Sequence, residues 1–329
     1  MILVKHNMDG KTNLKPYFYF ALEEYILKNL LKDDEAYFFT WIIEGIVIGK
    51  NQVLENEVNL TYTKNNNIDI YRRPTGGGTI YADENNFMYT MVTKQTNNFS
   101  FKKYLNLVVD AMKELDLDIK FSGRNDLLFE DKKISGAAFL QNKYGVLIHG
   151  TFMYDVDIET MIRSITPNDE KLISKGIDSV RSRVVNLKNH LNNISLNELI
   201  NHLEKHLTTK EYILSDDEIK LINKMAEKYE DKEFRFQKQP SYTKMLSKRI
   251  NGGLFNIQLD LNKGIIENMN ITGDFFDLFP VNIIEEKFEN VPYNKENLIK
   301  TLNSINIEDM ILDVKKEEFL SILLEGLID

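Results

Sequence analysis

The sequence predicts an α+β protein with a mixed or antiparallel sheet. Short runs of aromatic and β-branched residues, bounded by turn residues, alternate with segments whose apolar residues recur about every 3.6 positions. Several of the strand-forming runs follow one another closely enough to form hairpins, with helices between them. A chain of 329 residues is longer than one hydrophobic core usually covers. We therefore expect two domains.

The first part of the chain predicts strands, two helices and a glycine-rich hairpin. An initial short strand is followed by an amphipathic helix over residues 15–33, which we expect to be structural, and by a strand over 37–48. Two further strand-forming runs, 68–71 and 87–92, flank a glycine-rich turn and are interpreted as a hairpin. Apolar spacing predicts a second helix over 101–117.

The middle of the chain predicts more strands and a long connection. Residues 121–139 are interpreted as a hairpin that turns at 130–133, and residues 144–154 as a further strand. The polar connection over 167–189 is long for a compact domain, and connections of this length are usually functional or disordered.

Two capping-box matches predict where the next helices begin. In this motif a serine side chain and a glutamate three residues later satisfy open N–H groups of the first turn. The matches are Ser195-x-x-Glu198 and Ser215-x-x-Glu218. Both precede apolar stripes that we assign to the core.

The last part of the chain predicts a smaller module. Apolar and polar residues alternate over 255–271 around a central turn, and helices are predicted over 295–305 and 316–328. A module of this length is within the range of small domains. We expect a first domain over 1–246 and a second over 247–329.

Composition excludes several classes of protein. The formal charge is 41 − 50 = −9 and the isoelectric point is near 5.3, which argues against nucleic acid or an anionic membrane as the main partner. The sequence has no apolar run long enough for a membrane span and no signal-peptide pattern, so we expect a cytoplasmic protein. With no cysteine, disulfides, thiolate metal sites and a cysteine nucleophile are excluded. We do not expect the five histidines to form a zinc site.

The glycine-rich turn is the first candidate binding element. Gly76, Gly77 and Gly78 lack Cβ atoms, so their backbone can adopt positive φ and approach a ligand closely, with N–H groups directed at anionic oxygens. Arg72 and Arg73 add positive charge suited to phosphate or carboxylate. The alternative is a plain tight hairpin with two solvated arginines.

Two further polar clusters suggest a nucleotide site. Residues 72–79, 125–133 and 175–183 all combine cations with exposed backbone amides, and the second contains an Asn-Asp pair. Lys133 in that cluster could be an ordinary turn residue. Alternatively, its charge could stabilise the transition state in which a carboxylate attacks an α-phosphate.

Four motifs occur in an order that resembles the lipoate–protein ligase A family. They are Arg72-Arg73-x-x-Gly76-Gly77-Gly78-x-x-Tyr81-x-Asp83, Gly123-Arg124-Asn125-Asp126 with Lys133-Ile134-Ser135-Gly136, His149-Gly150-Thr151, and Lys175-Gly176-Ile177-x-Ser179-Val180-Arg181-Ser182-Arg183-Val184-x-Asn186-Leu187. The resemblance extends from the first helix to the C-terminus, because the last 80 or so residues look like the accessory domain of that family.

The resemblance implies a ligase domain related to the biotin ligases and a two-step reaction. Lipoate and ATP, with Mg²⁺, would form lipoyl-AMP and pyrophosphate. The lysine of an acceptor would then displace AMP; the acceptor would be a lipoyl domain of a 2-oxoacid dehydrogenase E2 subunit or the glycine-cleavage H protein. A monomer is expected.

The resemblance also implies roles for individual residues. Lys133 would be catalytic and contact the lipoyl carboxyl and the α-phosphate, Asp126 would hold the metal, and Asn125 would assist it. The pocket for lipoate and ATP would be lined by Arg72, Arg73, Gly76, Gly77, Gly78, Thr79, Ile80, Tyr81, His149, Gly150 and Thr151. The loop over the adenylate would contain Lys175, Gly176, Arg181 and Arg183.

The sequence departs from the family pattern at two places. Ala82 stands where the family commonly has histidine, which puts the acyl-chain preference in doubt, and residues 233–237 lack the usual Trp and Gly. Octanoyl or lipoyl transferases of the same fold use a cysteine that this chain lacks, and the arginine-glycine loop of biotin ligases is not seen. A non-catalytic adenylate-binding module stays as the alternative from another class.

Overall fold

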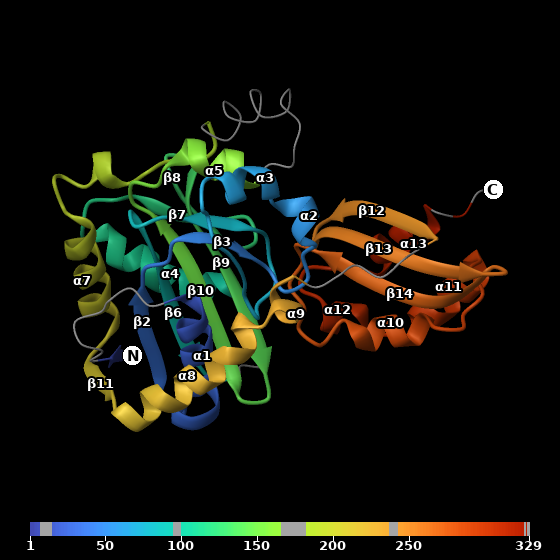
Figure 1. The fold of residues 1–329 in the computed structure, drawn as a ribbon, viewed down its shortest axis with the longest axis horizontal. Coiled ribbons are helices and arrows are strands. Elements are labelled where there is room, and N and C mark those ends of the chain that lie inside the picture. Colours follow the sequence, from blue (N-terminus) through green and yellow to red (C-terminus); the bar gives the residue numbers. More distant parts are fainter. Residues whose placement is uncertain (7–14, 95–99, 166–181, 237–242, 326, 328–329) are drawn as a thin grey trace. The chain divides into compact units, whose positions relative to one another are not determined.

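The computed structural model describes residues 1–6, 15–94, 100–165, 182–236, 243–325 and 327, and it divides into two compact units (Figure 1). The first unit contains residues 1–48, 55–73 and 80–235, and the second contains 49–54, 74–79 and 236–329. Two short loops from the first quarter of the sequence thus belong to the same unit as the C-terminal residues. No helix in the described part of the chain is both long and apolar enough to cross a membrane.

The first unit is built on an eight-stranded mixed sheet with the strand order β11-β1-β2-β6-β10-β9-β8-β7. Its strands are β1 (Ile2–His6), β2 (Ala36–Trp41), β6 (Asn86–Thr93), β7 (Ile119–Ser122), β8 (Asp126–Phe129), β9 (Lys132–Asn142), β10 (Gly145–Met153) and β11 (Lys210–Leu214). β1 is parallel to both of its neighbours, and the remaining pairs are antiparallel. The predicted fold class, the hairpin over 121–139 and the strand over 144–154 are confirmed. The turn of the hairpin is shorter than predicted, because Lys132 and Lys133 already pair with β8.

A separate three-stranded sheet corrects the prediction for the glycine-rich turn. It has the order β4-β3-β5 and consists of β3 (Gly45–Ile48), β4 (Ile70–Arg72) and β5 (Ile80–Ala82). The expected hairpin between 68–71 and 87–92 is wrong, because β4 pairs with β3 and the later run is β6 of the main sheet. The glycines therefore connect two strands that both flank β3, one parallel and one antiparallel to it.

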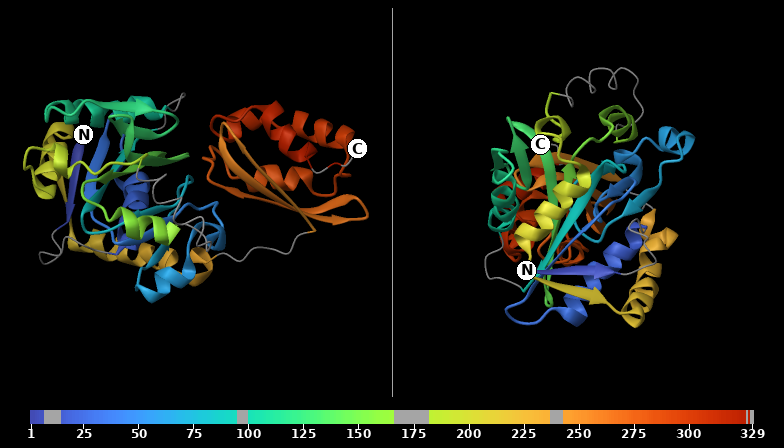
Figure 2. Two further views of the ribbon diagram at one scale, coloured as in Figure 1. Left: turned by 90° about the horizontal axis from the view of Figure 1, so that it is seen from above. Right: turned by 90° about the vertical axis from the view of Figure 1, so that its left-hand side faces the viewer.

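Helices pack in pairs around the main sheet. α1 contacts α8, and α4 contacts α7 (Figures 1 and 2). Up to residue 235 the described helical segments are α1 (Pro16–Tyr25) with the π-helical turn η1 (Ile26–Leu30), α2 (Leu54–Glu57), α3 (Leu60–Asn65), α4 (Phe101–Lys113), α5 (Ile158–Ile165), the 3₁₀ turn η2 (Lys188–His190), α7 (Leu196–Leu207), α8 (Asp216–Glu230) and α9 (Lys232–Arg235).

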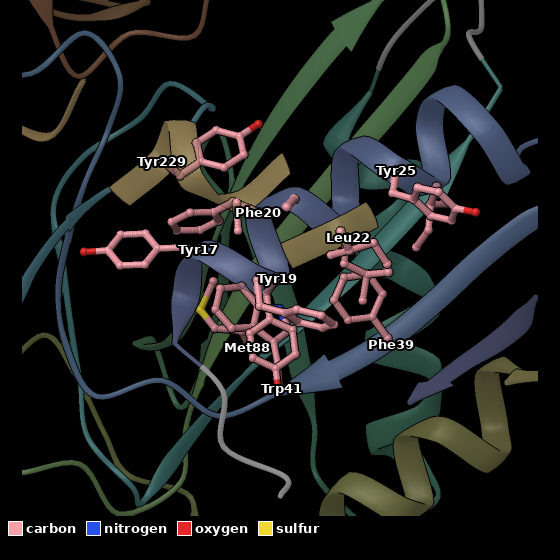
Figure 3. Packing of buried hydrophobic residues seen from close by; sticks show 14 of the residues in the cluster. Tyr17, Tyr19, Phe20, Leu22, Tyr25, Phe39, Trp41, Met88 and Tyr229 are labelled. Carbon is pink, nitrogen blue, oxygen red and sulfur yellow. The ribbon is translucent and has the colours of Figure 1, made fainter. Parts of the chain in front are cut away.

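α1 lies at the centre of the first core instead of on its surface. Every residue of α1 except Glu24 is buried, so the helix is enclosed on all sides and lacks the polar face of the amphipathic helix predicted over 15–33. Its expected structural role agrees with this burial. Figure 3 shows its aromatic side chains among residues of β2 and α8; Tyr19 and Trp41 stack with ring centroids 4.7 Å apart.

The second unit contains an antiparallel sheet with helices on one face (Figure 2). Its elements are β12 (Lys244–Ile250), β13 (Gly253–Asn262), β14 (Ile265–Gly273), α10 (Asn282–Phe288), α11 (Lys295–Asn303), α12 (Ile307–Met310) and α13 (Lys316–Leu324). Phe255, Ile257 and Leu259 alternate along β13 and are fully buried, as the apolar pattern predicted. β12, α10 and α12 were not predicted.

Both predicted capping boxes are present at the starts of α7 and α8. Ser215→Ala removes the acceptor of the Glu218 backbone N–H, so we expect the free energy of unfolding to fall by about 1 kcal/mol. Urea unfolding followed by far-UV circular dichroism measures this change. Ser195→Ala should give a similar loss at α7, and an unchanged midpoint in both variants would contradict the energetic role of the boxes.

Candidate functional site

Lys133 lies where the pairing of β9 with β8 is irregular. Leu127 is opposite Ser135, but Leu128 is opposite Lys133, so Ile134 is an extra residue on β9. A bulge of this kind bends the strand and redirects the neighbouring side chains. The Lys133 ammonium lies 2.8 Å from Asp126 Oδ1, and both side chains are partly exposed. The structure thus brings the predicted catalytic lysine and the predicted metal ligand into one ion pair.

Gly136 provides the space in which the Lys133 side chain lies. A Cβ atom at Gly136 would be 2.9 Å from Lys133 Nζ and 3.0 Å from Cε, closer than real Cβ contacts allow. Asp126 is the residue directly opposite Gly136 on β8. The glycine is therefore needed for the lysine to reach the carboxylate.

Three other predicted site residues surround this pair through backbone contacts. The Lys133 N–H donates to Arg183 O at 2.7 Å. Asn125 Nδ2 donates to Ala137 O, so this side chain holds β9 in place. Thr151 Oγ accepts from the Gly136 N–H at 3.3 Å. Asn125, Asp126, Lys133, Thr151 and Arg183 are thus brought together in the first unit.

His149 belongs to a buried polar chain that the sequence reasoning did not include. Its Nδ1 donates to Glu23 Oε1 at 2.8 Å, and Thr90 Oγ1 donates to the same oxygen at 3.0 Å. Trp41 Nε1 donates to Thr90 Oγ1 at 3.1 Å. Glu23 is fully buried, and its second oxygen has no hydrogen-bond partner among the described residues.

The predicted binding glycine Gly150 serves a packing role in this region. A Cβ atom there would lie 2.4 Å from the Tyr89 hydroxyl. Tyr89 is fully buried, and burial raises the pKa of its hydroxyl, so it stays neutral. Gly150 therefore admits the Tyr89 ring against β10.

The two adjacent arginines are both buried, which excludes the plain hairpin with solvated arginines. Arg73 Nη1 donates to Val47 O at 3.1 Å; burial lowers its pKa to about 9, an effect that Glu23 partly offsets. This value keeps the guanidinium charged at neutral pH. Arg72 Nε donates to Arg235 O at 3.2 Å, and burial lowers its pKa to about 10. Arg72 is thus engaged with α9.

The glycine-rich loop is held within the second unit. Gly77 has a φ of 86°, and its N–H donates to Phe275 O at 3.1 Å. A Cβ atom at Gly76 would lie 2.5 Å from the same oxygen, whereas one at Gly78 would meet no described atom closer than 4.0 Å. Thr79 Oγ1 donates to Gln52 Oε1 at 3.0 Å. The three glycines therefore differ in role.

A buried ion pair fixes the neighbouring loop of the same unit. Lys50 Nζ lies 2.5 Å from Asp277 Oδ2, and the Asp277 side chain is 5% exposed. The Lys50 N–H donates to Thr75 O, and Asn51 O accepts from the Gly273 N–H. Residues 49–54 and 74–79 are thus tied to each other and to the segment around Phe275.

Of the other residues predicted for the site, Ile80 and Tyr81 lie on β5. Burial raises the pKa of the Tyr81 hydroxyl. Ala82, the departure from the family pattern, is 1% exposed and belongs to the core of the first unit. Lys175, Gly176 and Arg181 lie outside the described residues.

Sequence reasoning missed a histidine pair with the spacing of zinc ligands. His202 and His206 are four residues apart on α7 and face Glu114. His202 Nε2 is 2.8 Å from Ala111 O, and His206 Nδ1 is 3.1 Å from Glu114 Oε1, so these nitrogens join α7 to the end of α4. No group of three or more His, Asp or Glu side chains in the described ranges is arranged to hold a metal ion.

Comparison with known proteins identifies the class of this chain. Residues 15–208 match the family model described as the lipoyl protein ligase A/B catalytic domain, and residues 239–323 match the bacterial lipoate protein ligase C-terminus. The chain therefore has the two parts of a lipoate ligase.

Relatives match over nearly the whole length. Lipoate-protein ligase LplJ of Bacillus subtilis is 31% identical over 327 residues, which cover 96% of this chain and 99% of the relative. Lipoate–protein ligase 1 of Staphylococcus aureus is 31% identical and covers 94% and 96%. The chain belongs to the lipoate-protein ligase family and is an enzyme of the ligase class.

Solved structures support the same fold. P. falciparum LipL1, solved in complex with lipoate, aligns over 98% of this chain and 97% of its own with a TM-score of 0.80 at 24% identity. A bipartite lipoate protein ligase of Thermoplasma acidophilum, solved in a study of its lipoylation system with its E2 lipoyl domain, covers 74% and 98% with a TM-score of 0.64 at 25% identity.

The polar chain predicts a measurable contribution of Thr90 to stability. Thr90→Val removes the hydroxyl that bonds both Trp41 and Glu23, so we expect a loss of about 1–3 kcal/mol in the free energy of unfolding. Trp41 is the single tryptophan, and its fluorescence during urea unfolding reports the change. Thr93→Val on the same strand is partly exposed and should change stability by less than about 0.5 kcal/mol. Equal effects of the two variants would contradict this role.

The glycine loop predicts a contrast between two neighbouring substitutions. Gly76→Ala places a methyl group against Phe275 O, so we expect a destabilisation of about 1–3 kcal/mol. Gly78→Ala meets no such obstacle and should stay within about 0.5 kcal/mol of the parent protein. Thermal unfolding of both variants tests this. A Gly78→Ala variant that is as unstable as Gly76→Ala would refute the assignment.

Proposed function

We propose that this chain is an ATP-dependent lipoate–protein ligase that works in two steps. Lipoate and ATP form lipoyl-AMP and pyrophosphate, and the ε-amine of a lysine on an acceptor protein then displaces AMP. The observation that carries this proposal is the position of Lys133, a partly exposed cation fixed at a β-bulge within the matched catalytic domain. Two relatives support the substrates: P. falciparum LipL1 was solved in complex with lipoate, and a lipoate-protein ligase A was solved with bound ATP.

Lys133 supplies the electrostatic part of the first step. A free carboxylate is a poor acyl donor, and adenylation gives it AMP as a leaving group. Negative charge grows at the α-phosphate while the carboxylate attacks, and a cation that is already in place stabilises this state without reorganisation. Arg73 adds a permanent charge, because its pKa stays above neutral in spite of burial.

The family resemblance implies binding roles for the other predicted residues. On that basis we assign lipoate and ATP binding to Arg72, Ile80, Tyr81, His149, Gly150 and Thr151 of the first unit and, separately, to the glycine loop with Thr79 of the second unit. The loop that contains Lys175, Gly176, Arg181 and Arg183 would cover the adenylate. Excluding water protects a mixed anhydride from hydrolysis.

Mg²⁺ is expected from the family resemblance, but the described residues do not fit a resident metal site. Asp126 is the single acidic residue among the predicted site residues, and it is paired with Lys133. No metal-binding group of three side chains is found elsewhere in the described ranges. We therefore assign no Mg²⁺ to a side chain; the ion would arrive bound to the phosphates of ATP.

We also propose acceptor proteins, a cellular location and domain boundaries for this chain. The acceptor would be an E2 lipoyl domain of a 2-oxoacid dehydrogenase or the glycine-cleavage H protein, and one relative was solved in a study that names its E2 lipoyl domain. We propose a cytoplasmic monomer without nucleic-acid or membrane partners. Residues 1–246 would form the catalytic domain and residues 247–329 the accessory domain.

Lys133→Ala tests the proposed function. We expect lipoate-dependent ATP–pyrophosphate exchange to fall by at least about 100-fold, because the cation at the α-phosphate is lost. Lys132→Ala is the matched control, since Lys132 precedes Lys133 on β9 and is exposed; it should retain exchange. Octanoate and biotin are assayed in parallel to define the acyl preference. Near-normal exchange by Lys133→Ala would refute the role of this lysine, and a wild-type protein without lipoate-dependent exchange would refute the proposed function.

A further inference from the structure

We propose that Asp126 is the positioning residue for Lys133 and not a metal ligand. The proposal deepens the proposed function and rests on it, because it concerns how the lysine is placed for adenylate formation. It departs from the role that the family resemblance implied for Asp126.

The backbone of Lys133 is fixed from both sides. Its N–H donates to Arg183 O at 2.7 Å, and its C=O accepts from the Val185 N–H at 3.1 Å, which forms a parallel bridge at Val184. On the other side, Lys133 is opposite Leu128 of β8, directly at the bulge. The main chain at Lys133 therefore has little conformational freedom. The direction of the Lys133 side chain depends on its contacts with Gly136 and Asp126.

The side chain of Lys133 crosses Gly136 and ends at Asp126. Asp126 and Gly136 are directly opposite each other in the β8–β9 register. The space that a Cβ at Gly136 would occupy is filled by the lysine, whose Nζ lies 2.9 Å from that point and 2.8 Å from Asp126 Oδ1. The position of the lysine ammonium is therefore set by the charge of the Asp126 carboxylate and by the space that the missing side chain of Gly136 leaves.

Stability does not explain this ion pair. The side chains of Lys133 and Asp126 are 41% and 33% exposed, and pairs in contact with water add little to folding. Lysine has four flexible carbons and loses rotamer entropy when it is fixed. The benefit of the pair is therefore positional: it places the ammonium before the substrate arrives, which is the preorganisation that electrostatic catalysis requires.

The same contact argues against a metal ion at Asp126. A divalent cation on this carboxylate would lie close to the lysine ammonium, and like charges at this distance repel. No additional His, Asp or Glu side chains complete a metal-binding group around it among the described residues. Metal binding at Asp126 would require Lys133 to leave the position that makes it useful.

Asp126→Asn and Asp126→Glu, assayed by lipoate-dependent pyrophosphate exchange over a range of Mg²⁺ concentrations, test the proposal. We expect kcat of Asp126→Asn to fall by about 10- to 100-fold, as a small misplacement of a catalytic group does. The Mg²⁺ concentration for half-maximal rate should stay within about twofold of wild type, and Asp126→Glu should recover part of kcat. A metal ligand would instead raise the Mg²⁺ requirement, with rates restored at high Mg²⁺, and this result would overturn the proposal. Unchanged kinetics would overturn it as well.

Gly136→Ala provides a second variant that leaves the carboxylate intact. Its methyl group should displace the ammonium and lower kcat in the same direction, again without a change in the Mg²⁺ requirement. Asp155→Asn is the matched control, because it removes the partner of Lys188 from another surface pair, with side chains 37% and 52% exposed. It should change neither kcat nor the melting temperature.

A readout that does not depend on turnover separates this proposal from the proposed function. The NMR signal of the Lys133 ammonium group can be assigned by its absence in Lys133→Arg. We expect Asp126→Asn to shift this signal and to accelerate its exchange with water, and Asp155→Asn to leave it unchanged. An NMR signal that does not respond to Asp126→Asn would refute the pairing of Lys133 with Asp126. This result would be informative even if the protein showed no lipoate-dependent ATP–pyrophosphate exchange.

Discussion

The buried carboxylate of Glu23 is the constraint on which the first unit depends. It is fully enclosed, and a buried charge is tolerated only where hydrogen bonds and opposite charge compensate for lost water. His149 and Thr90 donate to one of its oxygens, and the field of the charged Arg73 acts on it. These contacts join α1 to β10 and β6, and Trp41 extends the chain to β2. α1 cannot shift without leaving one of these groups unsatisfied.

This constraint extends to the site through β10. His149 and Thr151 are two residues apart and therefore lie on the same face of the strand. His149 is held by Glu23, and Thr151 contacts the backbone of Gly136, beside which Lys133 lies. Successive contacts thus connect the buried carboxylate to Lys133, the lysine that we propose to be catalytic. A rigid core of this kind gives a solvent-facing lysine a defined position.

Features determined by neighbouring residues could be predicted from the sequence, and features determined by distant ones could not. The capping boxes at Ser195 and Ser215 and the alternation along β13 involve groups a few residues apart, and the structure contains them. The pairing of β4 and β5 with β3 was missed because α2 and α3 lie between β3 and β4 in the sequence, so no hairpin pattern marks these strands as neighbours. Glu23 was missed because nothing in its spacing marks a glutamate as buried. The structure does bring together Lys133, Asp126 and Thr151, which the order of motifs had assigned to one site; their binding and catalytic roles stay a prediction.

The glycine triplet shows why a motif cannot be assigned to a ligand as a whole. Gly77 donates its N–H to Phe275 O, and Gly76 is required because that oxygen leaves no room for a side chain. These two glycines are explained by packing within the second unit. Gly78 has no such packing reason, since a methyl group there would fit. Space around the backbone therefore requires glycine at position 76 but not at position 78, so the three residues of one motif are glycine for different physical reasons.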